Sequence, residues 1–421
     1  MKNHGPKTNL GLPGWRSHLP SLWALIPIVA GLCFCEVLYE VASDHNLWFD
    51  WVRWRWSPWW PFYNDLAVTL DHFKAADHGL DPLADPQSTY AYPRAFLLLR
   101  HLRIQDIPSP IVGTVQAGLW MAAVIFVLRP RSFFRALLTT ALFIAPSFVL
   151  GLEQGNVDMA LFIVIVFAAV GWARAGSTWS RLWPITLVLL AAFLKMYPVF
   201  ALAGGAWATR GHWRLPWVAA MVLIGAYWAT HAQEISLIMS KFDLGNGGSW
   251  GCLLIFNRTF LFNLPHLWQI AVTIYACAFL VTIALGAWAS SGFREITVSP
   301  REWTFYWFGA AICAGCFLTT NYDYRWVYVL LTVPLLLRVL GKKRLLPAVW
   351  ASLTVLALAV SVGSPLYLHP LHKPFMIVQW ANWILILLLS FGFMAMRPRH
   401  LQGEIVQPAE GASLRDPLPE T

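Results

Sequence analysis

The chain has 421 residues, of which 58% are hydrophobic and 12% are charged, and its mean hydropathy is +0.55. A soluble domain carries roughly twice that charged fraction, so the composition excludes an ordinary soluble protein and indicates an integral membrane protein with many spans. Basic connections between the apolar segments account for the formal net charge of +9, which therefore gives no support for a nucleic-acid partner.

Apolar segments approaching the roughly 20 residues of a membrane-crossing helix follow one another along the chain. We predict them at residues 20–42, 111–128, 136–150, 157–173, 216–231, 266–287, 303–318, 326–340, 345–363 and 377–396. With short broken helices added, the predicted fold class is an all-α integral membrane bundle of about 10–12 transmembrane helices. Residues 20–396 form one predicted domain, between a cytoplasmic segment 1–19 and a disordered cytoplasmic tail 397–421.

Basic residues gather in alternate connections of this series. They are Arg129, Arg131, Arg135, Arg174, Arg181, Arg210, Arg214, Arg294, Arg301, Lys342, Lys343, Arg344, Arg397 and Arg399. By the positive-inside rule these connections face the cytoplasm, and the large loops 43–110 and 232–265 lie outside. The predicted location is the cell (plasma) membrane, with both termini cytoplasmic.

The apolar stretch 182–208 is interrupted by Lys195 and Pro198. Residues 182–194 would rise only about 20 Å as a helix, short of the roughly 30 Å hydrocarbon core. We therefore predict two short helices that meet near Lys195 on the outer side, and the alternative is one tilted, kinked helix. Broken helices are tolerated in membranes where they are buried in protein or line a cavity.

The first large loop contains six tryptophans between residues 48 and 60. Tryptophan is enriched at the membrane–water interface, so this segment is predicted to lie in the headgroup layer. A role for one or two of these rings in stacking on a sugar is the alternative.

Polar clusters fall in the connections predicted to lie outside, at residues 64–68, 81–94, 153–158, 195–198 and 321–325. Each has a simpler structural interpretation: Asp65 and Asp323 as helix caps, Tyr197 and Tyr324 as interfacial residues, and Gln154 and Asn156 as a turn. Together they favour a shared functional cavity. Topology gives no reason for Lys195 and Arg325 on this side; such cations need a partner, and an anionic substrate is one candidate.

The order of these motifs resembles a known family. It runs Asp-Leu-x-Val at 65–68, Asp-Pro at 81–82, Tyr-x-Tyr-Pro at 90–93, a Gln-Gly-Asn turn at 154–156, Lys-x-Tyr-Pro at 195–198 and Asp-x-Arg at 323–325. Over about residues 20–340 the chain is similar to the polyprenyl-phosphate-sugar-dependent glycosyltransferases of the GT-C fold, which include the mycobacterial mannosyltransferases that make phosphatidylinositol mannosides. Thr69, Leu83 and Arg94 depart from residues common in that family.

The resemblance implies transfer of a hexose, with mannose as one candidate, from a polyprenyl-phosphate carrier to a lipid-linked or glycan acceptor outside the cytoplasm. Its catalytic aspartate maps onto Asp65, which would take the proton of the acceptor hydroxyl in an inverting transfer. Lys195 and Arg325 would stabilise the departing lipid phosphate. The further expected substrate-binding residues are Tyr92, Arg94, Gln154, Asn156, Tyr197, Asp323 and Tyr324, and Glu36 and Glu40 are second candidates for an acidic role.

No Gly-rich phosphate loop is present, so no nucleotide site and no cofactor are expected. The mechanism requires no metal, although the clustered carboxylates do not exclude a bound metal ion. Two other classes remain: a multi-span transporter or lipid flippase, which broken helices also suit, and a structural or assembly subunit. A transporter should hold its polar residues near the membrane midplane and show two similar halves, and a structural subunit should tolerate substitution of the site without any effect on sugar transfer.

Overall fold

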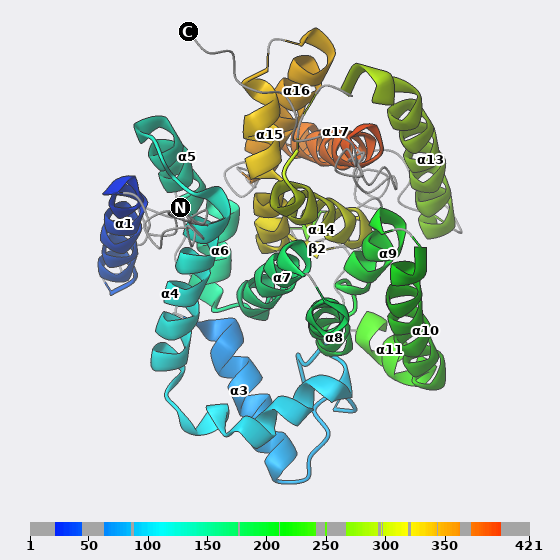
Figure 1. Ribbon diagram of the computed structural model, residues 1–421. Helices are drawn as coiled ribbons and strands as arrows, with labels where there is room; N and C mark the ends of the chain where they lie inside the picture. Colours follow the sequence, from blue (N-terminus) through cyan, green and yellow to red (C-terminus); the bar gives the residue numbers. More distant parts are fainter. Residues whose placement is uncertain are drawn as a thin grey trace, which may run out of the picture.

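Helices make up nearly all of the chain that the computed structural model describes, namely residues 22–43, 63–85, 88–175, 177–209, 211–240, 249–250, 267–293, 296, 298–318, 321–342, 344–362 and 372–396 (Figure 1). The α-helices of the first half are α1 (Leu25–Ser43), α3 (Asn64–Asp77), α4 (Ser109–Leu128), α5 (Phe133–Phe143), α6 (Pro146–Gln154), α7 (Val157–Arg174), α8 (Thr178–Leu194) and α9 (Val199–Ala208). Those of the second half are α10 (Arg214–Thr230), α11 (Ala232–Ser240), α13 (Leu267–Phe293), α14 (Pro300–Cys316), α15 (Val333–Leu340), α16 (Leu345–Val362) and α17 (His372–Ala395).

Short 3₁₀ helices and one strand pair complete the described elements. The 3₁₀ helices are η2 (Leu22–Ala24), η3 (Arg94–Leu102), η4 (Ile104–Asp106), η5 (Gly211–Trp213) and η6 (Asp323–Leu331). The two-residue strands β1 (Ser249–Trp250) and β2 (Asn321–Tyr322) pair antiparallel, with Ser249 opposite Tyr322.

The prediction of a helical membrane protein is confirmed at this coarse level. Within the described residues, five helices are long and apolar enough to cross a membrane, or up to seven if each of two bent helix pairs is one span. The predicted 10–12 transmembrane helices included short broken helices, and the described residues also contain three shorter apolar helices, at Leu22–Phe34, Trp179–Leu194 and Val199–Ala208. Residues 136–150 belong to α5 and α6, which are bent by 59°, and residues 326–340 begin as the 3₁₀ helix η6.

The stretch around Lys195 is divided in two, as predicted. α8 ends at Leu194, Lys195 is extended with φ −153° and ψ 134°, and α9 begins at Val199. Pro198 causes the break, because it lacks a backbone N–H and disfavours helical geometry in the residue before it. The alternative of one kinked helix is therefore wrong. α8 is longer than expected, because a capping box of Ser177 with Ser180 starts it at Thr178.

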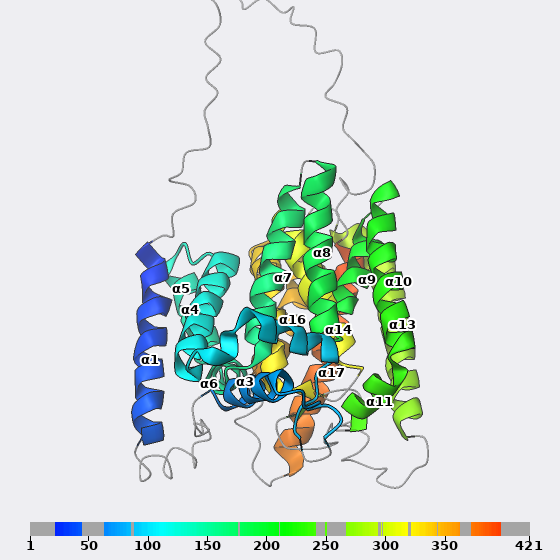
Figure 2. The ribbon, with the colours of Figure 1, turned by 90° about the horizontal axis from the view of Figure 1, so that it is seen from below.

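Part of the first predicted outer loop is itself folded. α3 and η3 lie across the bundle near one end, roughly perpendicular to the long helices α7, α8 and α10 (Figure 2). A small apolar core holds them together, and its buried members include Leu70, Phe73, Tyr90, Phe96 and Ile238 of α11. The tryptophan-rich segment 48–60 lies outside the described residues.

The basic connections gather at the opposite end of the bundle. Figure 2 shows the α7–α8 connection at that end and α3, α6 and α11 toward the other. Arg301 at the start of α14 donates from Nη2 to the carbonyl oxygen of Phe126 near the end of α4, at 2.6 Å. Arg338 of α15 forms an ion pair of 2.9 Å with Glu302. The bundle thus has one basic end and one end covered by short helices, which agrees with the predicted alternation of loops.

The core centres on α14, which packs against α7, α9, α17 and η6. Its residues Trp303, Phe305, Tyr306, Trp307 and Phe308 are all nearly fully buried. This helix therefore forms a rigid backing on which the elements of the polar cluster described below are held.

Candidate functional site

Asp65 lies in the first turn of α3 and faces α7. Its Oδ2 accepts a hydrogen bond of 2.8 Å from Nδ2 of Asn156. The N-cap residue of α3 is Tyr63, with φ 60° and no side-chain capping bond, so the interpretation of Asp65 as the helix cap is wrong. A carboxylate in the first turn is still favoured by the helix dipole, which contributes about 0.3–1 kcal/mol in exposed settings.

Asn156 connects α3 with the start of α7. It is 1% exposed, and its Oδ1 accepts the backbone N–H of Asp158 at 3.0 Å as the N-cap of α7. Its backbone oxygen accepts from Nε2 of Gln116 on α4 at 2.7 Å. Gly155 precedes it with φ +60°, a conformation that favours glycine. The turn predicted here therefore exists, and it aims the amide of Asn156 at Asp65.

Asp158 lies between the two cations that the topology left unexplained. Its Oδ2 is 2.9 Å from Nζ of Lys195 and 3.4 Å from Nε of Arg325. Asp158 is 0% exposed, and each cation is 6% exposed. The partner that the two cations were expected to need is, in this structure, a carboxylate of the chain itself. Oδ1 of Asp158 is buried and makes no hydrogen bond to the described residues.

Aromatic rings surround the two cations. Nζ of Lys195 is 5.2 Å from the ring centroid of Tyr92 and 5.5 Å from that of Tyr197. Cζ of Arg325 is also 5.5 Å from the centroid of Tyr197. Cations at this distance from a ring are attracted by its quadrupole, and the attraction strengthens when water is excluded. Tyr92 and Tyr197, both expected in the site, thus lie at the cations.

Tyr328, one turn further along η6 than Arg325, completes the cluster. Its hydroxyl lies 3.1 Å from that of Tyr197 and donates to the backbone oxygen of Asp158 at 3.3 Å. It is 0% exposed, so these hydrogen bonds satisfy a polar group that would otherwise be costly to bury. Tyr328 was not predicted as a site residue, since it lies inside an apolar run and has the pattern of a core residue.

The environment of Asp65 changes its acidity. Burial raises its pKa, while the hydrogen bond from Asn156 and the charge of Lys195 oppose the rise and the charge of Asp158 adds to it. The net result is a pKa above the ordinary value of 3.8. A raised pKa makes a carboxylate a better proton acceptor in its ionised form, as a general base requires.

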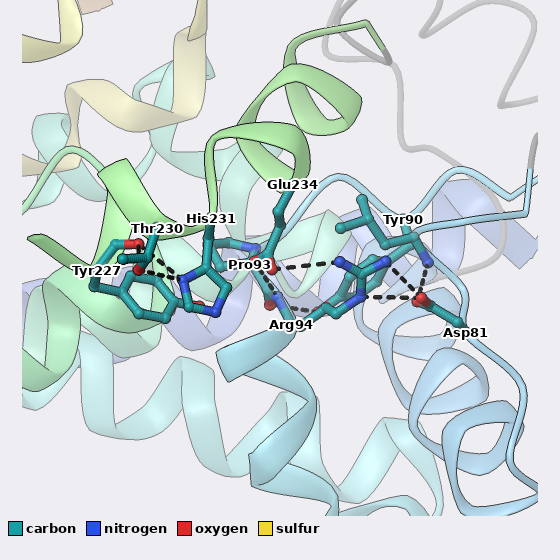
Figure 3. A network of polar contacts seen from close by, with 9 residues as sticks. Asp81, Tyr90, Pro93, Arg94, Tyr227, Thr230, His231 and Glu234 are labelled. Atoms are coloured by element: carbon teal, nitrogen blue, oxygen red, sulfur yellow. Dashed lines mark hydrogen bonds and ion pairs between the residues drawn. The ribbon is translucent and has the colours of Figure 1, made fainter.

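Arg94 does not join this cluster, although it was expected to bind substrate. Its guanidinium donates from Nε and Nη2 to Oδ2 of Asp81, at 2.9 and 2.6 Å, and lies 3.5 Å from Oε2 of Glu234 (Figure 3). The two partners already use most of its donors. Arg94 therefore acts as a connector between a loop and α11.

Other expected residues have different outcomes. Gln154 is 6% exposed at the end of α6, two residues before Asn156. The backbone of Asp323 and Tyr324 starts η6, and their side chains lie outside the part of the structure that is described. The same holds for the side chains of Glu36 and Glu40 on α1.

An apolar groove of about 390 Å³ lies between α9, α13, α14 and α17. Its lining includes Phe200 on α9, Tyr275 and Phe279 on α13, and Ala311 and Gly315 on α14. Phe200 is five residues beyond Lys195 along the chain. The lining is mostly apolar, so the groove can accommodate a hydrocarbon chain.

The cluster combines a partly exposed proton acceptor with two cations that are buried and largely shielded from water. Charges act more strongly in such surroundings than in bulk water. Among the described residues, no group of three or more His, Cys, Asp or Glu side chains is arranged to hold a metal ion. The arrangement can remove a proton from a bound hydroxyl and stabilise a negative charge that develops a few ångströms away.

Asp158 is the main residue that the sequence analysis did not single out. The signal that identifies it is a carboxylate one residue inside an otherwise apolar stretch, because an ionisable group there needs a partner within the protein.

No family model, no curated protein and no solved structure matches this chain.

Proposed function

We propose that this chain is a membrane glycosyltransferase. It transfers a hexose, with mannose as one candidate, from a polyprenyl-phosphate carrier to a lipid-linked or glycan acceptor on the extracytoplasmic side. One observation carries the proposal: Asp65 accepts a hydrogen bond from Asn156, and two residues after Asn156 the carboxylate of Asp158 pairs with both Lys195 and Arg325.

In this reaction Asp65 accepts the proton of the acceptor hydroxyl while the hydroxyl oxygen attacks the anomeric carbon. The bond between that carbon and the phosphate oxygen breaks, and its electron pair leaves with the lipid phosphate. Attack opposite to the leaving group inverts the configuration. Lys195 and Arg325 stabilise the charge that the phosphate gains, and the guanidinium can offer two N–H groups to it.

The apolar groove supports a lipid-linked donor. A prenyl chain is released from water when it enters a pocket lined by aromatic and small residues. In the proposed complex the phosphate lies at the cations and the prenyl chain occupies the groove, whose lining includes Phe200, five residues after Lys195. Membrane lipids are the natural competitors for this groove.

The decisive experiment is Asp65→Asn in membranes supplied with a labelled polyprenyl-phosphate hexose. Loss of a general base lowers a rate by about a hundredfold to ten-thousandfold. Asp71→Asn is the matched control, because Asp71 lies on the same helix in an exposed pair with Lys74, with side chains 71% and 54% exposed. Full transfer by Asp65→Asn at normal protein levels would refute Asp65 as the base.

A transporter or lipid flippase is the second candidate, favoured by the 80° bend between α10 and α11 and by the break at Lys195. Discontinuous helices often line transport sites at the midplane. Asp158, however, lies in the first turn of α7, away from the midpoint of that helix. Cysteines introduced at positions 65, 195 and 325 distinguish the two functions: labelling from the outside alone supports the transferase, and alternating access supports transport.

A further inference from the structure

A buried carboxylate, Glu234, lies at the start of α11 and faces η3. It is 4% exposed. Its Oε1 accepts the backbone N–H of Arg94 at 2.7 Å, and its Oε2 lies 3.5 Å from Nη1 of the same residue (Figure 3). An ionisable group is expensive to bury without partners, so both contacts are needed for its place in the structure.

The backbone contact of Glu234 serves as a helix cap supplied from a distant element. η3 starts at Arg94, and its N-cap residue is Pro93, whose side chain has no hydrogen-bond acceptor. The first N–H groups of a helix have no acceptor within the helix and attract a negative group. Glu234, 140 residues further along the chain, supplies this acceptor. It therefore fixes where η3 begins.

The side chain of Arg94 also holds the start of η3, through its pair with Asp81. Asp81 accepts two hydrogen bonds from its guanidinium and a third, on Oδ1, from the backbone N–H of Leu83 at 3.1 Å. Burial alone would raise the pKa of Asp81, but Arg94 and the backbone N–H groups lower it overall. The carboxylate is thus ionised near neutral pH. Asp81 holds the guanidinium of Arg94, and Arg94 is bound in turn by Glu234 of α11.

The contacts of Asp81 and Glu234 with Arg94 are connected to the polar cluster through Tyr92. Tyr90, which is 1% exposed, donates from its hydroxyl to the backbone oxygen of Pro93 at 2.9 Å. The ring of Tyr92 stacks on Phe96 of η3, with centroids 4.7 Å apart and planes at 21°. Nζ of Lys195 lies 5.2 Å from the centroid of the same ring. The start of η3 therefore decides where the ring of Tyr92 lies relative to Lys195.

We infer that Glu234 and Arg94 are positioning residues that hold Tyr92 against Lys195, and so set the affinity of the site for the phosphate of the lipid carrier. The inference rests on the proposed function for the identity of the ligand. Neither residue touches the reacting atoms. A cation whose direction is fixed by a ring loses less conformational freedom when it binds an anion.

The test measures binding of undecaprenyl phosphate to the purified full-length protein in nanodiscs. Glu234→Ala and Tyr92→Leu are each expected to raise its Kd about threefold to thirtyfold, the range that a buried cation–π contact supports. Because Glu234 acts through Tyr92, the double variant should bind no more weakly than the weaker single variant. Glu234→Asp, which keeps the carboxylate, should recover part of the affinity.

Two controls are needed, one for the role of the phosphate in binding and one for the location of the substituted residue. Undecaprenol, which lacks the phosphate, should bind all variants alike. Asp106→Ala should leave every Kd unchanged, because Asp106 pairs with Arg103 on the exposed side of the same segment, where the side chains are 57% and 79% exposed. Amide hydrogen exchange of residues 94–96 should accelerate in Glu234→Ala.

The outcomes separate this inference from the proposed function. An unchanged Kd in Glu234→Ala, additive effects in the double variant, or no binding of undecaprenyl phosphate by the wild type would overturn the inference. If the Kd values change in the variants as expected but the wild type transfers no sugar, the proposed function is overturned and the positioning role stands.

Discussion

The two carboxylates of the cluster, the partly exposed Asp65 and the buried Asp158, differ in their neighbours. Asp158 lies between two cations, whereas Asp65 is hydrogen-bonded by the neutral amide of Asn156. Carboxylates whose surroundings differ in this way divide into a fixed charge and a group able to exchange protons. Asp158 thus suits the role of counter-ion, and Asp65 suits that of base.

Asn156→Ser is expected to shift the pH profile of transfer. Serine keeps an oxygen that can cap α7 but removes the amide that donates to Asp65, and that hydrogen bond lowers the pKa of Asp65. The pKa should therefore rise further. Because only the ionised carboxylate is a base, transfer falls as the pH falls through this pKa, and the acidic limb should move to higher pH.

The measurement is initial rate against pH at saturating donor for the wild type and Asn156→Ser. Asn156→Ala serves as comparison, since it removes the cap as well and should also cost about 1 kcal/mol of stability. An acidic limb that stays in place in Asn156→Ser would contradict the assignment of that limb to Asp65.

At the scale of the elements, one aromatic ring fixes α3 against its neighbours. A Cβ atom added at Gly113 of α4 would lie 2.4 Å from Cγ of Tyr63, and one added at Gly155 would lie 3.0 Å from the same ring and 2.9 Å from Leu66. Only glycine allows the ring this close. The start of α3, and with it Asp65, is therefore held in place by packing between three segments.

Gly155→Ala is expected to destabilise the protein by more than Gly79→Ala. Both glycines have positive φ, +60° and +80°, so both variants strain the backbone by about 1–2 kcal/mol. Gly79 has no atom within 4 Å of an added Cβ, whereas Gly155 faces Leu66 and Tyr63. The overlap adds about 1–3 kcal/mol. Thermal unfolding in detergent measures both, and equal losses of Tm would refute the packing role.

For the whole molecule, the polar cluster and the basic connections lie at opposite ends. Asp158 is in the first turn of α7 and Arg174 is in its last. Sixteen residues of helix separate them by about 24 Å, close to the roughly 30 Å of a hydrocarbon core. The positive-inside rule predicts that the basic end lies in the cytoplasm, which would put the cluster on the outer side.

Cysteine labelling in intact cells tests this orientation. Asp71→Cys on the exposed face of α3 should react with a membrane-impermeant maleimide from outside. Ser177→Cys, exposed in the connection between α7 and α8, should react only after the cells are permeabilised. The wild type measures the background from native cysteines such as Cys33 and Cys277, which are exposed. The reverse pattern would contradict the positive-inside assignment.

Much of the helical order could be predicted from the sequence because local rules decide it. The break at Lys195 follows from a short apolar stretch and from Pro198, both visible in the chain. The division of 136–150 into α5 and α6 was missed, although Pro146 begins the second helix. The folded part of the first outer loop was also missed, because α3 and η3 depend on a core they share with α11.

The site was predictable as a set of residues but not as a set of contacts. Asp65 and Asn156 are 91 residues apart, and Asp158 and Arg325 are 167 apart. Composition and motif order identify such residues as candidates for a site. Which of them contact one another is decided by tertiary packing. Arg94 shows the limit most clearly, because its partners are Asp81 and Glu234, and Glu234 lies on α11, 140 residues further along the chain.

The counter-ion arrangement around Asp158 has a consequence for charge conservation in the proposed reaction. With Asp65 ionised, the two carboxylates cancel the charges of Lys195 and Arg325. When Asp65 takes the acceptor proton, the protein becomes more positive by one charge, and the departing phosphate becomes more negative by one. The total charge of the enclosed site is the same before and after transfer. Chemistry of this kind needs no ion to enter from water, which suits a site buried at the edge of a membrane.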